Sequence, residues 1–126
     1  MGPRILVHVC DCSGRWEPGQ GSPEARLAYL RWSEQGFWGE EPFGLGGMQL
    51  VARPPDLWFA NLVARSQDES MRYGALETCL DKLQGQARRL GASILMPRLG
   101  EGDWSRVEKL LQKMLSGLEV FLYEPD

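Results

Sequence analysis

Two segments of the chain combine glycines with polar side chains. The first covers residues 11–21 and reads DCSGRWEPGQG, and the second covers residues 97–102 and reads PRLGEG. Glycine lets backbone N–H groups come close to a ligand, and the positive end of a following helix dipole suits a phosphate. Neither segment has the spacing of a P-loop or of the Gly-x-Gly-x-x-Gly fingerprint, so ordinary glycine turns remain the alternative to a phosphate site.

Strand and helix patterns surround these two segments. Short apolar runs bounded by turn residues predict strands at residues 5–10, 48–52, 57–64, 93–96 and 119–123. Apolar residues three and four apart predict helices over residues 22–35 and 71–90. A third predicted helix begins after Asp103 or Ser105, which would cap it, and extends to residue 118. Residues 36–47 hold five glycines and are expected to form a surface loop with little regular structure.

The order of these elements predicts an α/β fold with a mixed central sheet flanked by helices. The continuous apolar run at residues 5–10 is typical of a strand buried on both faces, and residues 48–52 and 57–64 are expected to form a hairpin. A length of 126 residues suits a single domain, residues 1–126. Ligands of such folds bind outside the carboxyl ends of the strands, where both glycine-containing segments begin.

The charge, the apolar runs and the cysteines of the sequence exclude several classes of partner. The 14 basic and 17 acidic residues are interspersed and give a net charge of −3, so no strong nucleic-acid footprint is present. The sequence has no apolar run of membrane-spanning length and no signal-peptide pattern, which makes the cytoplasm the expected compartment, without membrane partners. We interpret Cys10 and Cys79 as reduced cysteines in the core, and Cys12 as a thiol in a loop. His8 is interpreted as a core histidine. With this set of residues we expect no metal site and no cofactor.

The two glycine-containing segments resemble the ligand loops of the macrodomain family. The resemblance rests on residues 5–16 and 95–102, and residues 62–65, 73–76 and 120–123 follow in the family's order, so it covers nearly the whole chain. By pattern the sequence is most similar to the branch that contains the terminal ADP-ribose protein glycohydrolase and a chromatin-remodeller macrodomain. The resemblance implies a three-layer macrodomain-like fold with an ADP-ribose pocket.

The resemblance also implies which residues form that pocket. Gly19, Gln20 and Gly21 match the loop that contacts the diphosphate and the distal ribose, and residues 100–102 match the opposing loop. Tyr123 matches an aromatic residue that packs near the adenine. The full set of expected ligand-binding residues is Asp11, Ser13, Gly19, Gln20, Gly21, Arg65, Pro97, Arg98, Gly100, Glu101, Gly102 and Tyr123.

Two departures from the family pattern affect this expectation. Macrodomains usually begin with a strand that ends in Gly-Asp-Ile or Gly-Asp-Leu, whose aspartate holds the adenine amino group; that segment is missing before residue 5, and Asp11 is the nearest acid. The lysine nucleophile of the glycohydrolase branch aligns with Arg65, whose guanidinium stays protonated, so lysine-based catalysis is not expected. Asp103 and Glu101 remain candidate catalytic acids, with helix capping and solvent exposure as their ordinary roles.

Three functions are compatible with this pattern. The leading one is binding of ADP-ribose, free or attached to a macromolecule. An enzymatic alternative is hydrolysis that removes ADP-ribose from protein or nucleic acid, with water activated by Asp103 or Glu101. A third is a degenerate macrodomain that binds proteins through the aromatic residues Phe37 and Trp38.

Overall fold

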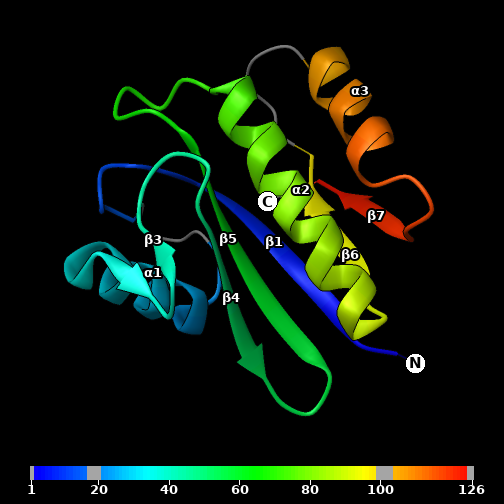
Figure 1. Cartoon of the computed structure of the whole chain (residues 1–126), viewed down its shortest axis with the longest axis horizontal. Coiled ribbons are helices and arrows are strands. Elements are labelled where there is room, and N and C mark those ends of the chain that lie inside the picture. The colour runs from blue at the N-terminus through cyan, green and yellow to red at the C-terminus, as the bar shows by residue number, and fades with distance from the viewer. Residues whose placement is uncertain (1, 17–20, 99–103, 125–126) are drawn as a thin grey trace.

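A five-stranded mixed sheet forms the centre of the described part of the chain (Figure 1). The computed structural model describes residues 2–16, 21–98 and 104–124. Its strands are β1 (Arg4–Asp11), β4 (Met48–Arg53), β5 (Leu57–Arg65), β6 (Ser93–Pro97) and β7 (Val120–Tyr123), in the spatial order β4-β5-β1-β6-β7. Strands β5, β1, β6 and β7 run parallel, and β4 pairs antiparallel with β5. The predicted α/β class, the mixed sheet and the 48–64 hairpin are confirmed.

The register of the parallel strands places their carboxyl ends at one edge of the sheet. Leu6 of β1 lies opposite Leu95 of β6, and Leu95 lies opposite Phe121 of β7. At the carboxyl edge, Asp11 lies opposite Arg65 and Pro97 lies opposite Tyr123. Residues that are far apart in the sequence therefore reach one edge, as the strand pattern predicted.

Helix α1 (Pro23–Gln35) covers one face of the sheet over β4 and β5. It begins at Ser22, whose Oγ accepts a hydrogen bond from the Ala25 amide at 3.0 Å, and it ends at Gly36 in the left-handed conformation. A buried amide pair fixes it to the sheet, since Asn61 donates to the Ala25 carbonyl at 3.0 Å and Gln49 donates to the Ala28 carbonyl at 2.8 Å. These two side chains also bind each other at 2.9 Å.

Helices α2 (Tyr73–Leu90) and α3 (Trp104–Met114) lie together on the opposite face (Figure 1). The larger core cluster forms between them and the sheet and includes Ile5, Val7, Leu80, Leu83 and Ile94, each at most 1% exposed. Helix α2 ends at Gly91, as its sequence predicted. Its first residue is Tyr73 rather than Met71, because Met71 forms a β-bridge with Arg65.

The structure corrects three of our expectations. The segment 36–47 holds more regular structure than expected, because β2 (Phe37–Trp38) and β3 (Glu41–Pro42) form a short antiparallel hairpin beside α1. Ser105 lies inside α3 and is not its cap, and α3 ends at Met114, so Leu118 follows the helix. Strand β1 is not buried on both faces: alternate residues are only half-buried, because α1 packs mainly on β4 and β5.

Within the described ranges, no helix has both the length and the apolar character needed to cross a lipid bilayer.

Candidate functional site

The carboxyl edge of the sheet brings together residues from two separate parts of the sequence. At β1 and β5, the register shifts between Cys10 and Asp11, and the Cys12 amide continues the pairing by donating to the Arg65 carbonyl at 3.0 Å. At β6 and β7, the Arg98 amide donates to the Tyr123 carbonyl at 2.8 Å. Backbone pairing therefore fixes where the loops after β1 and β6 leave the sheet.

Asp11 and Ser13 form a compact turn at the start of the first loop. Asp11 Oδ1 accepts hydrogen bonds from the Ser13 amide at 2.8 Å and from Ser13 Oγ at 2.5 Å. Ser13 Oγ in turn accepts from the Arg15 amide at 3.0 Å. Such local bonds hold the backbone of a turn, so Oδ1 of Asp11 is engaged in shaping the loop.

Tyr29 attaches this turn to helix α1. Its hydroxyl donates to the Asp11 carbonyl at 2.7 Å and accepts from the Gly14 amide at 3.1 Å. Burial raises the pKa of Tyr29 well above its usual value, so the hydroxyl stays protonated and can serve as both donor and acceptor. Gly14 lies at φ +84°, where glycine avoids the strain that a side chain would bring.

Trp16, in the first loop, packs on His8 of β1 and on Tyr29 of α1. Its ring stacks on His8 with centroids 4.3 Å apart and lies 5.3 Å from the Tyr29 ring. Gly21 makes room for this packing, because a Cβ at Gly21 would lie 2.9 Å from Cζ2 of Trp16. His8 Nδ1 lies 3.2 Å from the Cys10 thiol, but burial raises the pKa of Cys10 well above its usual value, so the thiol is not an activated nucleophile.

Arg65, which the resemblance aligns with the lysine of the glycohydrolase branch, is the last residue of β5. Its side chain is half-buried, and Nη1 donates to the Val9 carbonyl at 3.5 Å. A guanidinium has no accessible neutral form and therefore cannot attack a sugar as an amine does. The charge of Arg65 at the strand end suits an anion instead.

A hollow of about 300 Å³ opens between β7 and the start of α3. Two aromatic residues, Trp104 and Tyr123, line it together with Arg98, Glu108, Leu122 and Glu124. The Arg98 guanidinium lies 5.4 Å from the centroid of the Trp104 ring and 3.3 Å from Oε1 of Glu124. Tyr123 is 40% exposed, so a ligand can reach its ring. Partial burial raises the pKa of Tyr123.

The expected site residues fall into two groups. Asp11, Ser13, Gly21, Arg65, Pro97, Arg98 and Tyr123 are described, and all belong to the strand ends or to the loops that follow β1 and β6. Gly19, Gln20, Gly100, Glu101, Gly102 and Asp103 lie outside the described residues. The sequence reasoning did not name Trp104, Glu108 and Glu124 as site residues. The adjacency of Glu124 to Tyr123 was a signal for one of them.

The cysteines are free thiols, and Cys10 and Cys79 are buried as expected. Over residues 2–16, 21–98 and 104–124, no group of three or more His, Cys, Asp and Glu side chains is arranged to hold a metal ion.

Solved structures with the same architecture identify the class of protein. The chain superimposes on a macrodomain protein from Streptomyces coelicolor with a TM-score of 0.88 and 33% sequence identity, over 100% of this chain and 90% of the other. Two structures from Bacteroides thetaiotaomicron, one described as a protein of unknown function, match at a TM-score of 0.82 and 25% identity. They cover 99% of this chain and 91% and 89% of their own. No protein-family model and no curated protein sequence matches.

The full-length match and its sequence identity show that the chain belongs to the macrodomain family. That fold suggests ADP-ribose binding in general.

Proposed function

We propose that this macrodomain binds ADP-ribose, free or attached to a macromolecule, at the carboxyl edge of its sheet. The observation that carries the proposal is the hollow between Trp104 and Tyr123, beside the end of β6. An accessible aromatic pair suits a flat base, and its position next to the loop after β6 suits a nucleotide whose phosphates follow that loop.

The diphosphate is assigned to the two glycine-containing loops. They leave the sheet from β1 and β6, which are neighbouring parallel strands, and β1 continues to Asp11 beyond its pairing with β6, which ends at Leu6 and Leu95. Gly19, Gln20 and Gly21 on the first loop and Gly100, Glu101 and Gly102 on the second are the proposed diphosphate contacts. The guanidinium groups of Arg65 and Arg98 supply positive charge at the same edge.

Glu108 is our candidate for recognition of the adenine amino group. Asp11, the acid expected from the sequence, uses Oδ1 to hold Ser13. Two acids line the hollow, Glu108 and Glu124. Glu124 forms an ion pair with Arg98, whereas Glu108 belongs to the first turns of α3, across the hollow from β7. A carboxylate that accepts a hydrogen bond from an N–H group of the base would distinguish adenine from bases without an amino group.

A tryptophan fluorescence titration tests this assignment. We expect saturable quenching on addition of ADP-ribose, because Trp104 lines the proposed base site. Trp104→Phe should lose most of the signal change and keep binding within about threefold, since phenylalanine still offers a ring. Trp38→Phe, on the β2–β3 hairpin, is the matched control and should keep the full signal. Quenching that is unchanged in Trp104→Phe would contradict the assignment.

The enzymatic alternative depends on Asp103 and Glu101 and has a direct test. Incubation with an ADP-ribosylated peptide distinguishes a protein that binds the modification from one that removes it. We expect binding without release of ADP-ribose, because Arg65 replaces the lysine nucleophile. Release that disappears in Asp103→Ala or Glu101→Ala would establish the hydrolase instead.

A further inference from the structure

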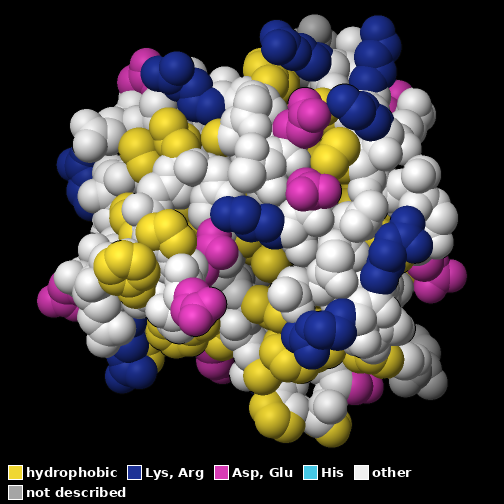
Figure 2. Space-filling model, in the orientation of Figure 1, with side chains coloured by type: hydrophobic (Ala, Val, Ile, Leu, Met, Phe, Trp, Pro, Cys, Tyr) yellow, Lys and Arg dark blue, Asp and Glu magenta, His cyan; other side chains and the backbone are white. Residues whose placement is uncertain are grey.

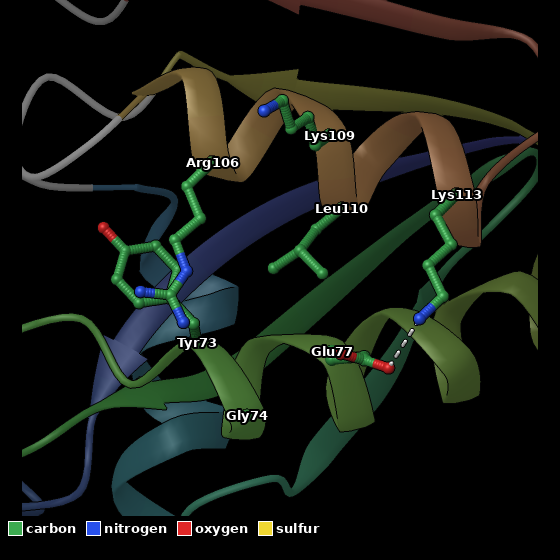
Figure 3. A pocket seen from close by; sticks show the side chains of 7 residues that line it. All are labelled: Tyr73, Gly74, Glu77, Arg106, Lys109, Leu110 and Lys113. Atoms are coloured by element: carbon green, nitrogen blue, oxygen red, sulfur yellow. Dashed lines mark hydrogen bonds and ion pairs between the residues drawn. The ribbon is translucent and has the colours of Figure 1, made fainter.

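A second concave surface, the α2–α3 groove, lies between the two helices on the same face of the sheet. It encloses about 300 Å³, and its lining comes from the first turns of α2 and from most of α3. Figure 3 shows Tyr73, Gly74 and Glu77 on one side and Arg106, Leu110 and Lys113 on the other, with Lys109 at the outer rim of α3. None of these residues belongs to the ADP-ribose site proposed above.

Basic side chains lie at both ends of the groove, and its floor is apolar. Leu110 points from α3 towards α2 between the two ends (Figure 3). At one end the Arg106 guanidinium lies 4.1 Å from the centroid of the Tyr73 ring, and at the other Lys113 Nζ lies 3.3 Å from Oε1 of Glu77. Basic side chains also gather over α3 on the surface in Figure 2. Three basic residues and one acid thus line a groove on a chain of net charge −3.

We propose that the α2–α3 groove binds an acidic peptide segment with an apolar side chain between its carboxylates. Arg106 and Lys113 are seven residues apart on α3, about 10 Å along the helix axis, which an extended peptide spans with three or four residues. Carboxylates at the ends of such a segment reach the basic side chains while the apolar side chain covers Leu110. At the Lys113 end, the peptide carboxylate takes the place of Glu77; both side chains of that ion pair are exposed, and such exposed pairs contribute little to stability.

The arrangement of basic and apolar residues in the α2–α3 groove favours a peptide over a nucleic acid. A nucleic-acid strand presents a continuous row of phosphates and binds a correspondingly extended basic surface. Here the basic residues flank an apolar centre, which interrupts the row of positive charge. A short acidic and apolar peptide satisfies both the charged ends and the floor.

The inference does not depend on the proposed ADP-ribose function. The test uses a fluorescein-labelled peptide, Glu-Glu-Leu-Gly-Glu-Glu, and its counterpart with glutamine at every glutamate. We expect saturable binding of the acidic peptide, at least tenfold weaker binding of the glutamine peptide, and weakening of the former with added salt. Equal binding of the two peptides, or no binding at millimolar concentration, would overturn the proposal.

Two charge-reversal variants locate the site. Arg106→Glu and Lys113→Glu should each reduce peptide affinity at least fivefold, and the matched variant Arg26→Glu on the exposed side of α1 should leave it within twofold. Thermal unfolding of each variant verifies the fold, and ADP-ribose titration should give unchanged affinity in all three. Peptide affinity that falls equally in Arg26→Glu would overturn the site, as would tighter binding of a labelled twelve-nucleotide oligothymidine than of the peptide.

Discussion

The backbone amide of Arg98 donates a hydrogen bond to the carbonyl oxygen of Tyr123 at 2.8 Å. This bond extends the pairing of β6 and β7 by one residue beyond Pro97 and holds the second loop at the end of the last strand. The Arg98 side chain then reaches over Trp104 on α3. A single backbone contact thereby brings together the strand end, the loop and the helix that form the proposed base site.

Replacing Tyr123 by alanine should weaken ADP-ribose binding at least fivefold. Stacking of a base on an aromatic ring is worth about 1–3 kcal/mol, and every 1.4 kcal/mol is a factor of ten in affinity. Tyr123→Phe should bind within about twofold of the parent, because the ring is kept. Leu27→Ala removes a side chain of similar exposure from α1 and is the control for nonspecific effects. Calorimetric titration measures all four proteins, and equal affinity in Tyr123→Ala would exclude Tyr123 from the site.

Glu108→Ala should reduce the preference for adenine. The parent protein is expected to bind ADP-ribose about fivefold more tightly than the inosine analogue, whose base lacks the amino group, and the variant should bind both equally. The reason is that a hydrogen bond to a charged acceptor contributes about 1.5–3 kcal/mol, less when solvent reaches it. Glu119→Ala makes the same charge change just before β7 and should keep the preference. If Glu108→Ala still discriminates the two bases, another residue recognises the amino group.

Gly21→Ala should destabilise the protein by about 1–3 kcal/mol. Gly21 lies at φ +63°, where a side chain costs about 1–2 kcal/mol, and a Cβ there would displace Trp16 from His8. Gly85→Ala is the opposite control, because no heavy atom lies within 4 Å and alanine favours the interior of α2 by about 1 kcal/mol. Denaturant unfolding should therefore move the two midpoints in opposite directions. A neutral Gly21→Ala would show that Trp16 does not need this close approach.

Asn61→Ala should cost about 2–4 kcal/mol of unfolding free energy. The substitution removes the donors to Gln49 and to the Ala25 carbonyl, and it leaves a cavity beneath α1. Gln112→Ala, on the exposed side of α3, should change stability by less than about 0.5 kcal/mol. Urea unfolding followed by circular dichroism measures both variants. An Asn61→Ala protein as stable as the parent would mean that the amide pair does not hold α1.

Buried thiols predict loss of stability at alkaline pH. Burial raises the pKa of Cys79 to about 12, and it raises that of Cys10 as well. An unfolded chain releases these protons near pH 8.5, whereas the folded chain retains them, so stability should be full below about pH 8 and fall as pH rises towards 12. At pH 8, a thiol reagent should label Cys12 first and the other two only on unfolding. Rapid labelling of all three thiols in the folded protein would contradict this.

The sequence predicted most of the sheet and helices because their periodic patterns match what the fold buries. The stripe on α2 that ends at Gly91 and the hairpin of β4 and β5 are examples. The β2–β3 hairpin was missed because each strand has only two residues, flanked by glycines, which gives too little pattern to detect. The half-buried face of β1 was missed because periodicity does not reveal where on the sheet a helix will pack.

The candidate site was predicted only as far as the strand ends determine it. Asp11, Arg65, Pro97 and Tyr123 lie at the carboxyl edge because each ends a strand and these four strands are parallel, a direction that the strand order implies. Trp104 and Glu108 join the hollow through the placement of α3 against β7, a contact that no spacing in the sequence encodes. Similarly, the role of Asp11 in holding Ser13 depends on the local turn rather than on residue type.

Calorimetric titration of the purified protein with ADP-ribose, ADP and AMP tests the central claim most directly. A site that combines an aromatic base pocket with two diphosphate loops should bind ADP-ribose in the micromolar range, bind ADP more weakly because the distal ribose is missing, and bind AMP weakest of the three. No heat of binding with any of them, at millimolar ligand and with a folded protein, would contradict the proposed function and show a macrodomain fold without a nucleotide site.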